Sequence, residues 1–192
     1  VILDLDDSVK IRAEELLSKK QEIIQCFKEI LKIKITAMKI RVHGDFHLKR
    51  ILFTGKDFII TDFDGEPEKT ASQKRLKYPA LRDVASMMRS FHYAIYSAFF
   101  QRAEMRPTDA QILEQWINPW LFYMSNMFLR GYLEGVEGAP FVPQDKSQFH
   151  ILLQVISLEK SMNELAYELT NRHEWVIIPI TGILHILEDY QT

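Results

Sequence analysis

Residues 39–67, KIRVHGDFHLKRILFTGKDFIITDFDGEP, constrain the fold more than any other stretch of the chain. Two short apolar runs, 51–53 and 58–60, flank a turn-forming Gly-Lys-Asp sequence. This pattern predicts two short strands joined by a tight turn. A hairpin returns the residues after its second strand to those before its first strand. We therefore expect Asp45 and Asp62 to face one pocket.

Two carboxylates placed in this way suit phosphoryl transfer. One orients the attacking hydroxyl and accepts its proton, and another holds the magnesium that bridges the nucleotide phosphates. Protein kinases supply them from the motifs HRDxxxxN and DFG. Here His43-Gly44-Asp45 matches the first motif with Gly in place of Arg, and Asp62 to Gly65 resembles the second with one extra residue. The alternative interpretation is a polar surface hairpin with ordinary turn aspartates.

Four blocks, in order, resemble the bacterial maltokinases, which have a kinase-like fold related to aminoglycoside phosphotransferases and are often fused to trehalose synthase. The blocks are HGDFHL, DFDGEP, PALRDVASMMRSFHYA and LEKSMNELAYELTNRHEWVIIPITGIL. They begin at about residue 39 and continue toward the end, whereas residues 1–38 match only by position. The resemblance implies transfer of the ATP γ-phosphate to maltose, or to a related small saccharide, with ATP and Mg²⁺ as cofactors and maltose 1-phosphate as product.

The resemblance also implies roles for single residues. They are Asp45 as catalytic base, Asp62 as metal ligand, His43, His47 and Asp83 as supporting groups, Arg50 beside the nucleotide, and Lys160, Tyr167 and Asn163 at the sugar. Asp83 would accept hydrogen bonds from the catalytic-loop backbone; the alternative is an ordinary aspartate at a helix N-terminus. The alternative for the polar face around Lys160 is a solvated surface with weak local ion pairs.

Two positions depart from the family. Arg50 stands where the family has Asn or Gln near the second magnesium; a cation repels magnesium, although a guanidinium can contact a phosphate directly. Asn163 replaces a tyrosine, which removes a stacking face but keeps hydrogen-bonding capacity. These departures favour a non-catalytic module for assembly or sugar binding, whereas Asp45, His47 and Asp62 favour an enzyme. We expect the parent protein to be the enzyme.

The rest of the chain predicts a mostly α fold with a small β-hairpin. By resemblance it is the C-terminal lobe of a kinase-like fold, a single domain over 1–192 with an N-terminal helix (1–38), a catalytic hairpin (39–67) and a helical body (80–192). No Gly-rich strand turn or strand lysine precedes residue 39. We therefore expect an N-terminal lobe to lie outside this chain, and the chain alone to be inactive. The resemblance also implies a trehalose synthase domain outside this chain.

Helical periodicity predicts the helices and their buried stripes. We expect helices over 9–34, 81–105, 108–137, 144–171 and from about 181. Thr108 is the expected cap of the third helix, and Pro119 is a candidate position for a bend or an interruption in it. The residues predicted to face the core are Ile11, Leu16, Ile23, Phe27, Ile30, Leu31, Leu81, Val84, Ala85, Met88, Phe91, Ile95, Phe99, Trp116, Trp120, Phe122, Met127, Phe128, Ile151, Val155, Leu158, Met162, Leu165 and Leu169. Alternatively, one aromatic residue of the third helix lines a saccharide pocket.

Composition narrows the classes of function. Hydrophobic residues make up 47% of the 192 residues, with twelve Phe, which argues against disorder. A net charge of −2 gives no basic field for nucleic acid. No apolar run is long enough to cross a membrane, and one cysteine, Cys26, excludes an internal disulfide, as expected for a cytoplasmic protein. The first residue is Val1, so we expect a piece of a longer chain.

Overall fold

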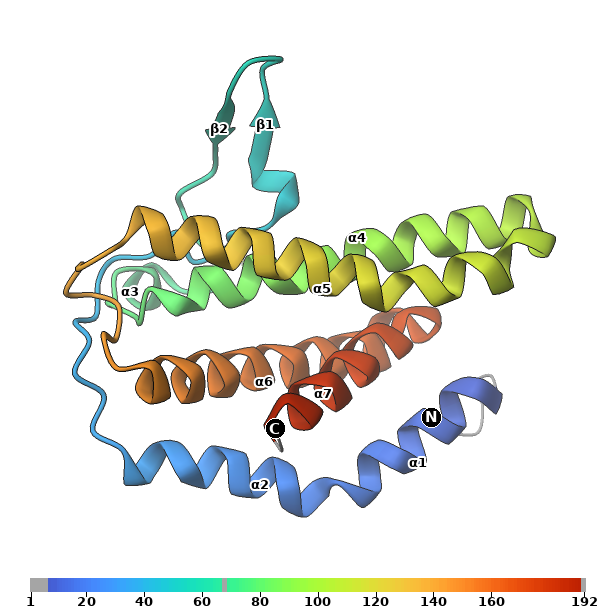
Figure 1. The fold of residues 1–192 in the computed structure, drawn as a ribbon, viewed down its shortest axis with the longest axis horizontal. Coiled ribbons are helices and arrows are strands. Elements are labelled where there is room, and N and C mark those ends of the chain that lie inside the picture. Colours follow the sequence, from blue (N-terminus) through green and yellow to red (C-terminus); the bar gives the residue numbers. More distant parts are fainter. Residues whose placement is uncertain (1–6, 67–68, 191–192) are drawn as a thin grey trace. The chain divides into compact units, whose positions relative to one another are not determined.

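The computed structural model describes residues 7–66 and 69–190 (Figure 1). Contacts divide the chain into two compact units: residues 37–142 form one, and residues up to 36 together with those from 143 form the other. Most of the described chain is helical, with a single two-stranded sheet, as the sequence predicts. Among the described residues, no helix combines the length and the apolar character needed to cross a membrane.

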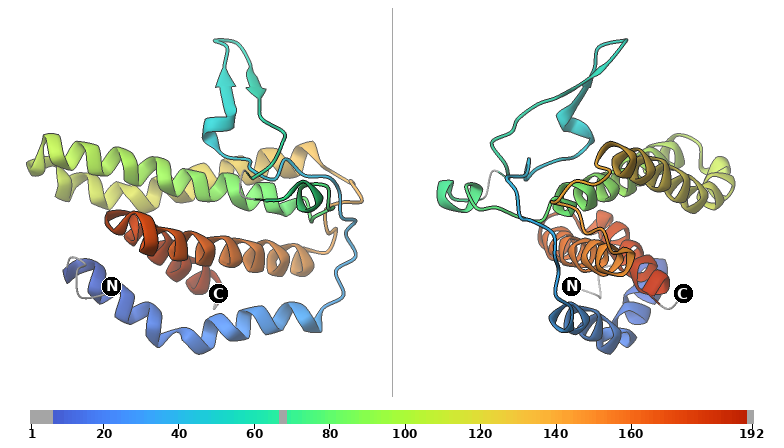
Figure 2. Two further views of the ribbon diagram at one scale, coloured as in Figure 1. Left: turned by 180° about the vertical axis from the view of Figure 1, so that it is seen from behind. Right: turned by 60° about the vertical axis from the view of Figure 1, so that its left-hand side comes forward.

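The predicted hairpin lies in the unit of residues 37–142. A 3-10 turn, η3 (Leu48–Arg50), leads into β1 (Ile51–Phe53), which pairs antiparallel with β2 (Phe58–Ile60). The register sets Ile51 opposite Ile60 and Phe53 opposite Phe58. The turn closes through a hydrogen bond of 2.9 Å from the Thr54 N–H to the Asp57 carbonyl oxygen. Figures 1 and 2 show the hairpin extending away from the helices of its unit.

The same unit contains two long helices that pack side by side. They are α4 (Leu81–Met105), whose bounds agree with the prediction, and α5 (Ala110–Gly135), joined through the 3-10 turn η4 (Pro107–Asp109). The Phe91 ring of α4 meets Trp120 and Phe128 of α5 edge-on, with centroids 6.4 and 5.7 Å away. This aromatic contact fixes α4, which carries Asp83 in its first turn.

Several details of α4 and α5 were predicted wrongly. Met87 of α4 is buried rather than Met88, which is half-buried. On α5, Trp116, Phe122 and Met127 are exposed, Trp116 by 61%. α5 is apolar on more of its surface than α4 covers, so periodicity overstates its buried face. Thr108 is not the cap: Asp109 precedes the helix without a side-chain capping bond, and α5 continues through Pro119.

The other unit begins with α1 (Asp7–Ser18), α2 (Lys20–Glu29) and the 3-10 turn η2 (Ile30–Lys32). The predicted single helix over 9–34 is therefore wrong. The chain turns at Lys19, which has φ −88° and ψ 10° and donates its N–H to the Leu16 carbonyl at 3.1 Å. This break buries Leu16 and Cys26 in one cluster, whereas Ile11 and Leu31 of the predicted stripe are exposed by 66% and 83%.

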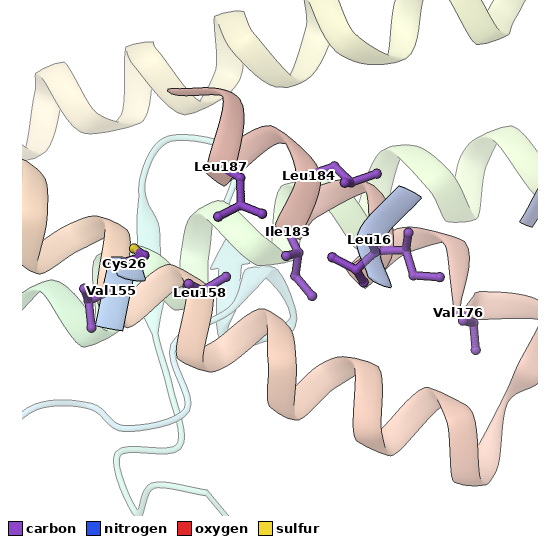
Figure 3. Packing of buried hydrophobic residues seen from close by; sticks show 9 residues of the cluster. Leu16, Cys26, Val155, Leu158, Val176, Ile183, Leu184 and Leu187 are labelled. Carbon is purple, nitrogen blue, oxygen red and sulfur yellow. The ribbon is translucent and has the colours of Figure 1, made fainter. Parts of the chain in front are cut away.

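The unit is completed by α6 (Lys146–Asn171), the 3-10 turn η5 (His173–Trp175) and α7 (Ile177–Tyr190). Asp145 caps α6 by accepting a hydrogen bond of 2.8 Å from the Gln148 N–H. α7 begins before the predicted residue 181, since Pro179 lies in the first turn, where a missing N–H costs nothing. The core in Figure 3 comprises Leu16, Cys26, Val155, Leu158, Val176, Ile180, Ile183, Leu184 and Leu187. Met162 of the predicted stripe is partly exposed.

Candidate functional site

Asp45 and Asp62 reach the same side chain, the guanidinium of Arg50. Arg50 Nη2 lies 2.6 Å and Nε 3.2 Å from Asp45 Oδ2, while Arg50 Nη1 lies 2.5 Å from Asp62 Oδ2. The two carboxylates therefore converge at the base of the hairpin, as its geometry predicts. The sequence did not reveal that a cation joins them.

The hairpin ladder explains this convergence. Arg50 is the last residue before β1, and Thr61 is the first residue after β2. The Thr61 N–H donates to the Arg50 carbonyl oxygen at 2.9 Å, and the Arg50 N–H donates to the His47 carbonyl oxygen at 2.8 Å. Pairing thus continues one step past the strands and places Arg50 beside Asp62.

Asp62 adopts a backbone conformation that is uncommon for a non-glycine residue. Its φ is 61°, and no other non-glycine residue among those described has a positive φ. The left-handed region costs energy for a residue with a Cβ, and aspartate is among the side chains that tolerate it best. Strain of this kind is held by the surrounding structure and gathers at functional sites.

His43 is buried and both of its ring nitrogens are occupied. Nδ1 accepts a hydrogen bond of 3.3 Å from the Asp45 N–H, and Nε2 lies 2.8 Å from the Thr61 carbonyl oxygen. A neutral ring that accepts at Nδ1 carries its proton on Nε2, so Nε2 donates to Thr61. The ring of Phe63 packs against His43 at 4.8 Å between centroids. His43 thus ties the loop of Asp45 to the end of β2.

Asp83 clamps the same loop from α4. Its Oδ2 accepts from the His43 N–H at 2.7 Å, and its Oδ1 accepts from the Gly44 N–H at 2.9 Å. These are the hydrogen bonds that the resemblance implies for Asp83; its part in catalysis stays a prediction. Gly44 has a φ of 85°, and a Cβ there would lie 3.4 Å from Gly65 Cα. Glycine therefore lets the loop pass close to the segment after Asp62.

His47 lies beside Asp45 but does not supply a permanent charge. Its Nε2 is 3.5 Å from Asp45 Oδ2. Burial lowers the pKa of His47 below its ordinary value, and the attraction of Asp45, which acts in the opposite direction, only partly offsets it. The hydrogen bond to Asp45 raises the pKa of Arg50, so Arg50 stays charged. Arg50 is therefore the cation that neutralises Asp45.

Side-chain and backbone contacts hold the segment after Asp62 where the structure describes it. Tyr78 pairs with Ile40 in an isolated β-bridge, with N–H to oxygen distances of 2.9 and 3.0 Å. The Arg82 guanidinium lies 5.1 Å from the Tyr78 ring centroid and 3.8 Å from a Glu66 carboxylate oxygen. Lys69 pairs with the same Glu66 at 2.9 Å. These contacts fasten Glu66, Lys69 and Tyr78 to the start of α4.

The three expected sugar contacts lie on α6, in the other unit. Asn163 and Tyr167 are exposed and Lys160 is half-buried. Their position next to Asp45 stays a prediction.

Glu168, on the same helix, is buried although periodicity placed it on the polar face. It is 1% exposed and accepts hydrogen bonds of 2.8 and 2.5 Å from the Arg172 guanidinium. The only sign of this ion pair in the sequence is that Glu168 and Arg172 are four residues apart, a spacing that allows side chains on a helix to interact.

Magnesium, which the resemblance implies, does not fit the residues as they stand. Within residues 7–66 and 69–190, no cluster of three or more His, Cys, Asp or Glu side chains could hold a metal ion. The two candidate carboxylates, Asp45 and Asp62, already share the Arg50 guanidinium. A divalent ion between them would have to displace a cation held by three hydrogen bonds.

The sequence of the chain is similar to those of glucosamine kinases. No model of a known protein family matches the sequence. The chain is 25% identical over 150 residues to a glucosamine kinase from Streptacidiphilus jiangxiensis, which covers 78% of the chain and 32% of that protein. It is 24% identical over 150 residues to a glucosamine kinase from Mycolicibacterium smegmatis, over 77% of the chain and 34% of that protein.

Solved structures agree with these relatives in fold. A glucosamine kinase in complex with glucosamine, ADP and inorganic phosphate matches 99% of the chain with a TM-score of 0.76 and 22% identity. The match covers 44% of that structure, and a second crystal form of a glucosamine kinase gives a TM-score of 0.74. The chain thus shares its kinase-like fold with part of these enzymes. It spans about a third of the length of the curated relatives.

Proposed function

We propose that this chain is the C-terminal lobe of a kinase-like sugar phosphotransferase, which transfers the γ-phosphate of ATP to a small saccharide. The observation that carries the proposal is the convergence of Asp45 and Asp62 at the base of the hairpin, on a loop clamped by Asp83. The glucosamine kinases that resemble the chain in sequence and in fold support the same reaction type. The ADP in one of them supports ATP as the donor.

In this proposal Asp45 is the general base. Arg50 and His47 both approach its Oδ2, and within the described residues Oδ1 has no hydrogen bond or ion pair, so Oδ1 is the atom left for the substrate. A sugar hydroxyl oxygen attacks the γ-phosphorus, the bond to the β-phosphate oxygen breaks, and ADP leaves. The hydroxyl proton passes to Asp45. Asp62 faces the phosphates from the other side of Arg50.

The acceptor in this proposal is a small saccharide. The names of the relatives favour an amino sugar such as glucosamine, whereas the maltokinase resemblance favours maltose, with maltose 1-phosphate as product. The proposed sugar contacts are Lys160, Asn163 and Tyr167. Asn163 in place of a family tyrosine favours a ligand held by hydrogen bonds rather than by stacking, and so the amino sugar.

The C-terminal assignment of this lobe rests on the resemblance, and the exposed hairpin and the greater length of the relatives support a further lobe beside it. Leu52 and Ile59, a cross-strand pair, are about half exposed, and their neighbours Phe53 and Phe58 are each 66% exposed. An isolated two-stranded hairpin with an apolar surface is marginal by itself and usually packs against further structure. A strand-rich N-terminal lobe is the proposed cover. A fused trehalose synthase domain, which the resemblance implies, stays a prediction.

The test is a steady-state assay of the natural protein that carries this chain. ADP release is coupled to NADH oxidation and measured with glucosamine and maltose in parallel. Phosphorylation of either sugar is expected, and Asp45→Asn should lower kcat by about a hundred- to ten-thousand-fold because the general base is lost. Asp57→Asn, in the exposed hairpin turn, is the matched control and should keep full activity.

A second candidate is a sugar-binding module without turnover, and Arg50 is the observation that favours it, since it holds both site carboxylates. Calorimetric titration of both sugars separates the two candidates. Sugar binding without ADP release would favour the module. ADP release that survives Asp45→Asn unchanged would contradict the proposed base, and the absence of both sugar binding and turnover would reject both candidates.

A further inference from the structure

The guanidinium of Arg50 binds both site carboxylates, including Asp62, the residue that the resemblance assigns to a divalent ion. Such ions bind carboxylate oxygens and neutralise the charge of the nucleotide phosphates. Here Asp45 Oδ2 and Asp62 Oδ2 are both hydrogen-bonded to Arg50, at 2.6 and 2.5 Å. The negative charge of the pair is thus partly neutralised before any ligand enters.

Arg50 is not a loose surface side chain that happens to lie nearby. Its backbone N–H donates to His47 and its carbonyl oxygen accepts from Thr61, so the residue is fixed from both sides at the base of the hairpin. Its side chain is 26% exposed. Hydrogen bonds between ionised groups are about twice as strong as neutral ones. Magnesium also gives up its own water reluctantly, so it competes poorly for this pair.

We infer that Arg50 is the resident cation of the site: it excludes divalent metal from Asp45 and Asp62 and offers its own charge to phosphate in the metal's stead. A guanidinium has five N–H donors. Three are used by the two carboxylates, which leaves two for a phosphate oxygen. The phosphate part of this inference rests on the proposed function, whereas the exclusion of metal does not.

The test for metal exclusion uses Mn²⁺ alone as the probe, with free Mn²⁺ measured by electron paramagnetic resonance in the presence of the 192-residue chain. The unaltered chain is expected to show no specific site, and Asp62→Asn to change nothing. Arg50→Gln should bind Mn²⁺ at least about tenfold more tightly than the unaltered chain does. The double variant Arg50→Gln, Asp62→Asn should lose this binding. Lys49→Gln, which deletes the neighbouring exposed charge, is the matched control and should create no site.

Two results would overturn the exclusion of metal. One is that the unaltered chain binds Mn²⁺ and that Asp62→Asn abolishes this binding. This result can be obtained even if the Arg50→Gln variant does not fold. The other is an equal gain from Lys49→Gln and Arg50→Gln, which would assign the effect to net charge. Circular dichroism of each variant verifies that it is folded.

The phosphate part is tested on the natural protein by ADP binding with and without EDTA. Binding that survives EDTA, and that falls at least tenfold in Arg50→Gln under EDTA, is expected. A strict requirement for a divalent ion would overturn this part. Absence of ADP binding under all conditions would overturn the proposed function together with the phosphate part, while the Mn²⁺ measurement still decides the exclusion of metal.

Discussion

Asp83 accepts hydrogen bonds from two consecutive backbone N–H groups, those of His43 and Gly44. Asp83→Ala leaves both groups without this partner in a partly buried loop, and an unsatisfied buried donor costs about 1–3 kcal/mol. We expect the free energy of unfolding, measured by urea titration, to fall by about 2–4 kcal/mol. Asp64→Ala, at an exposed carboxylate, should change it by less than about 0.5 kcal/mol. Equal losses in the two variants would show that the clamp contributes nothing.

The Tyr132 hydroxyl is buried and lacks a hydrogen-bond partner among the described residues. Burial, and secondarily the charge of Asp83, raise the pKa of Tyr132 to about 12. The folded protein therefore holds this proton more tightly than the unfolded chain, so stability is complete below about pH 10 and falls as pH rises toward 12. Tyr132→Phe should remove part of that fall and cost no stability at neutral pH. Urea unfolding of both proteins at neutral pH and near pH 12 tests this. A clear loss of unfolding free energy by Tyr132→Phe at neutral pH would mean that the Tyr132 hydroxyl does have a hydrogen-bond partner.

At the level of single residues, the sequence predicts which chain segments meet but not how their side chains pair. The hairpin pattern was sufficient to bring Asp45 and Asp62 together, because strand pairing follows from backbone geometry. The bridge through Arg50 depends on a side-chain conformation that no spacing encodes. Glu168 was likewise assigned to a polar face, since a charged residue is rarely buried unless it is paired.

At the level of elements, the β1–β2 hairpin exposes apolar side chains on a nearly unsupported ribbon. The rings of Phe53 and Phe58 lie 5.1 Å apart across the strands. Replacing both by Thr keeps the β-propensity and removes the largest exposed apolar groups of the hairpin. We expect weaker concentration-dependent self-association in light scattering, with little loss of stability, because such a cross-strand pair contributes about 0.2–1 kcal/mol.

The control for the hairpin is Phe122→Thr, which removes an equally exposed aromatic side chain from α5. If self-association falls as much in this variant as in the Phe53→Thr, Phe58→Thr double variant, then exposed aromatic area in general drives it. If the double variant associates as strongly as the unaltered chain, the hairpin is not the contact surface.

Elements whose boundaries are set by local chemistry were predicted best. Leu81 begins α4 and Asp145 caps α6 in the expected regions. The break between α1 and α2 could not be predicted, since Lys19 is a good helix former and no Gly or Pro marks the position. The break is explained by the burial of Leu16 and Cys26 against the core residues of α6 and α7. Such tertiary contacts override helix propensity.

At the level of the whole molecule, the chain corresponds to only part of the enzymes it resembles. If the proposed N-terminal lobe supplies the cover over the nucleotide phosphates, the 192-residue chain alone should show no ATP-dependent phosphorylation of glucosamine or maltose. The measurement is product formation by the chain, with the natural protein as positive control. Turnover by the chain itself would mean that the 192-residue chain already holds a complete site.

The unit that contains α1, α2, α6 and α7 is discontinuous in sequence. Thr36 donates its N–H to the side-chain oxygen of Gln148, 112 positions away, at 3.0 Å. During translation α1 and α2 therefore leave the ribosome well before α6 and α7, the helices that cover them, exist. The apolar faces of α1 and α2 therefore remain uncovered while the entire 37–142 unit is synthesised. That unit can already fold during this time. Chaperones that bind exposed apolar helices have their longest opportunity in that interval, and a pause in synthesis before residue 146 would prolong it.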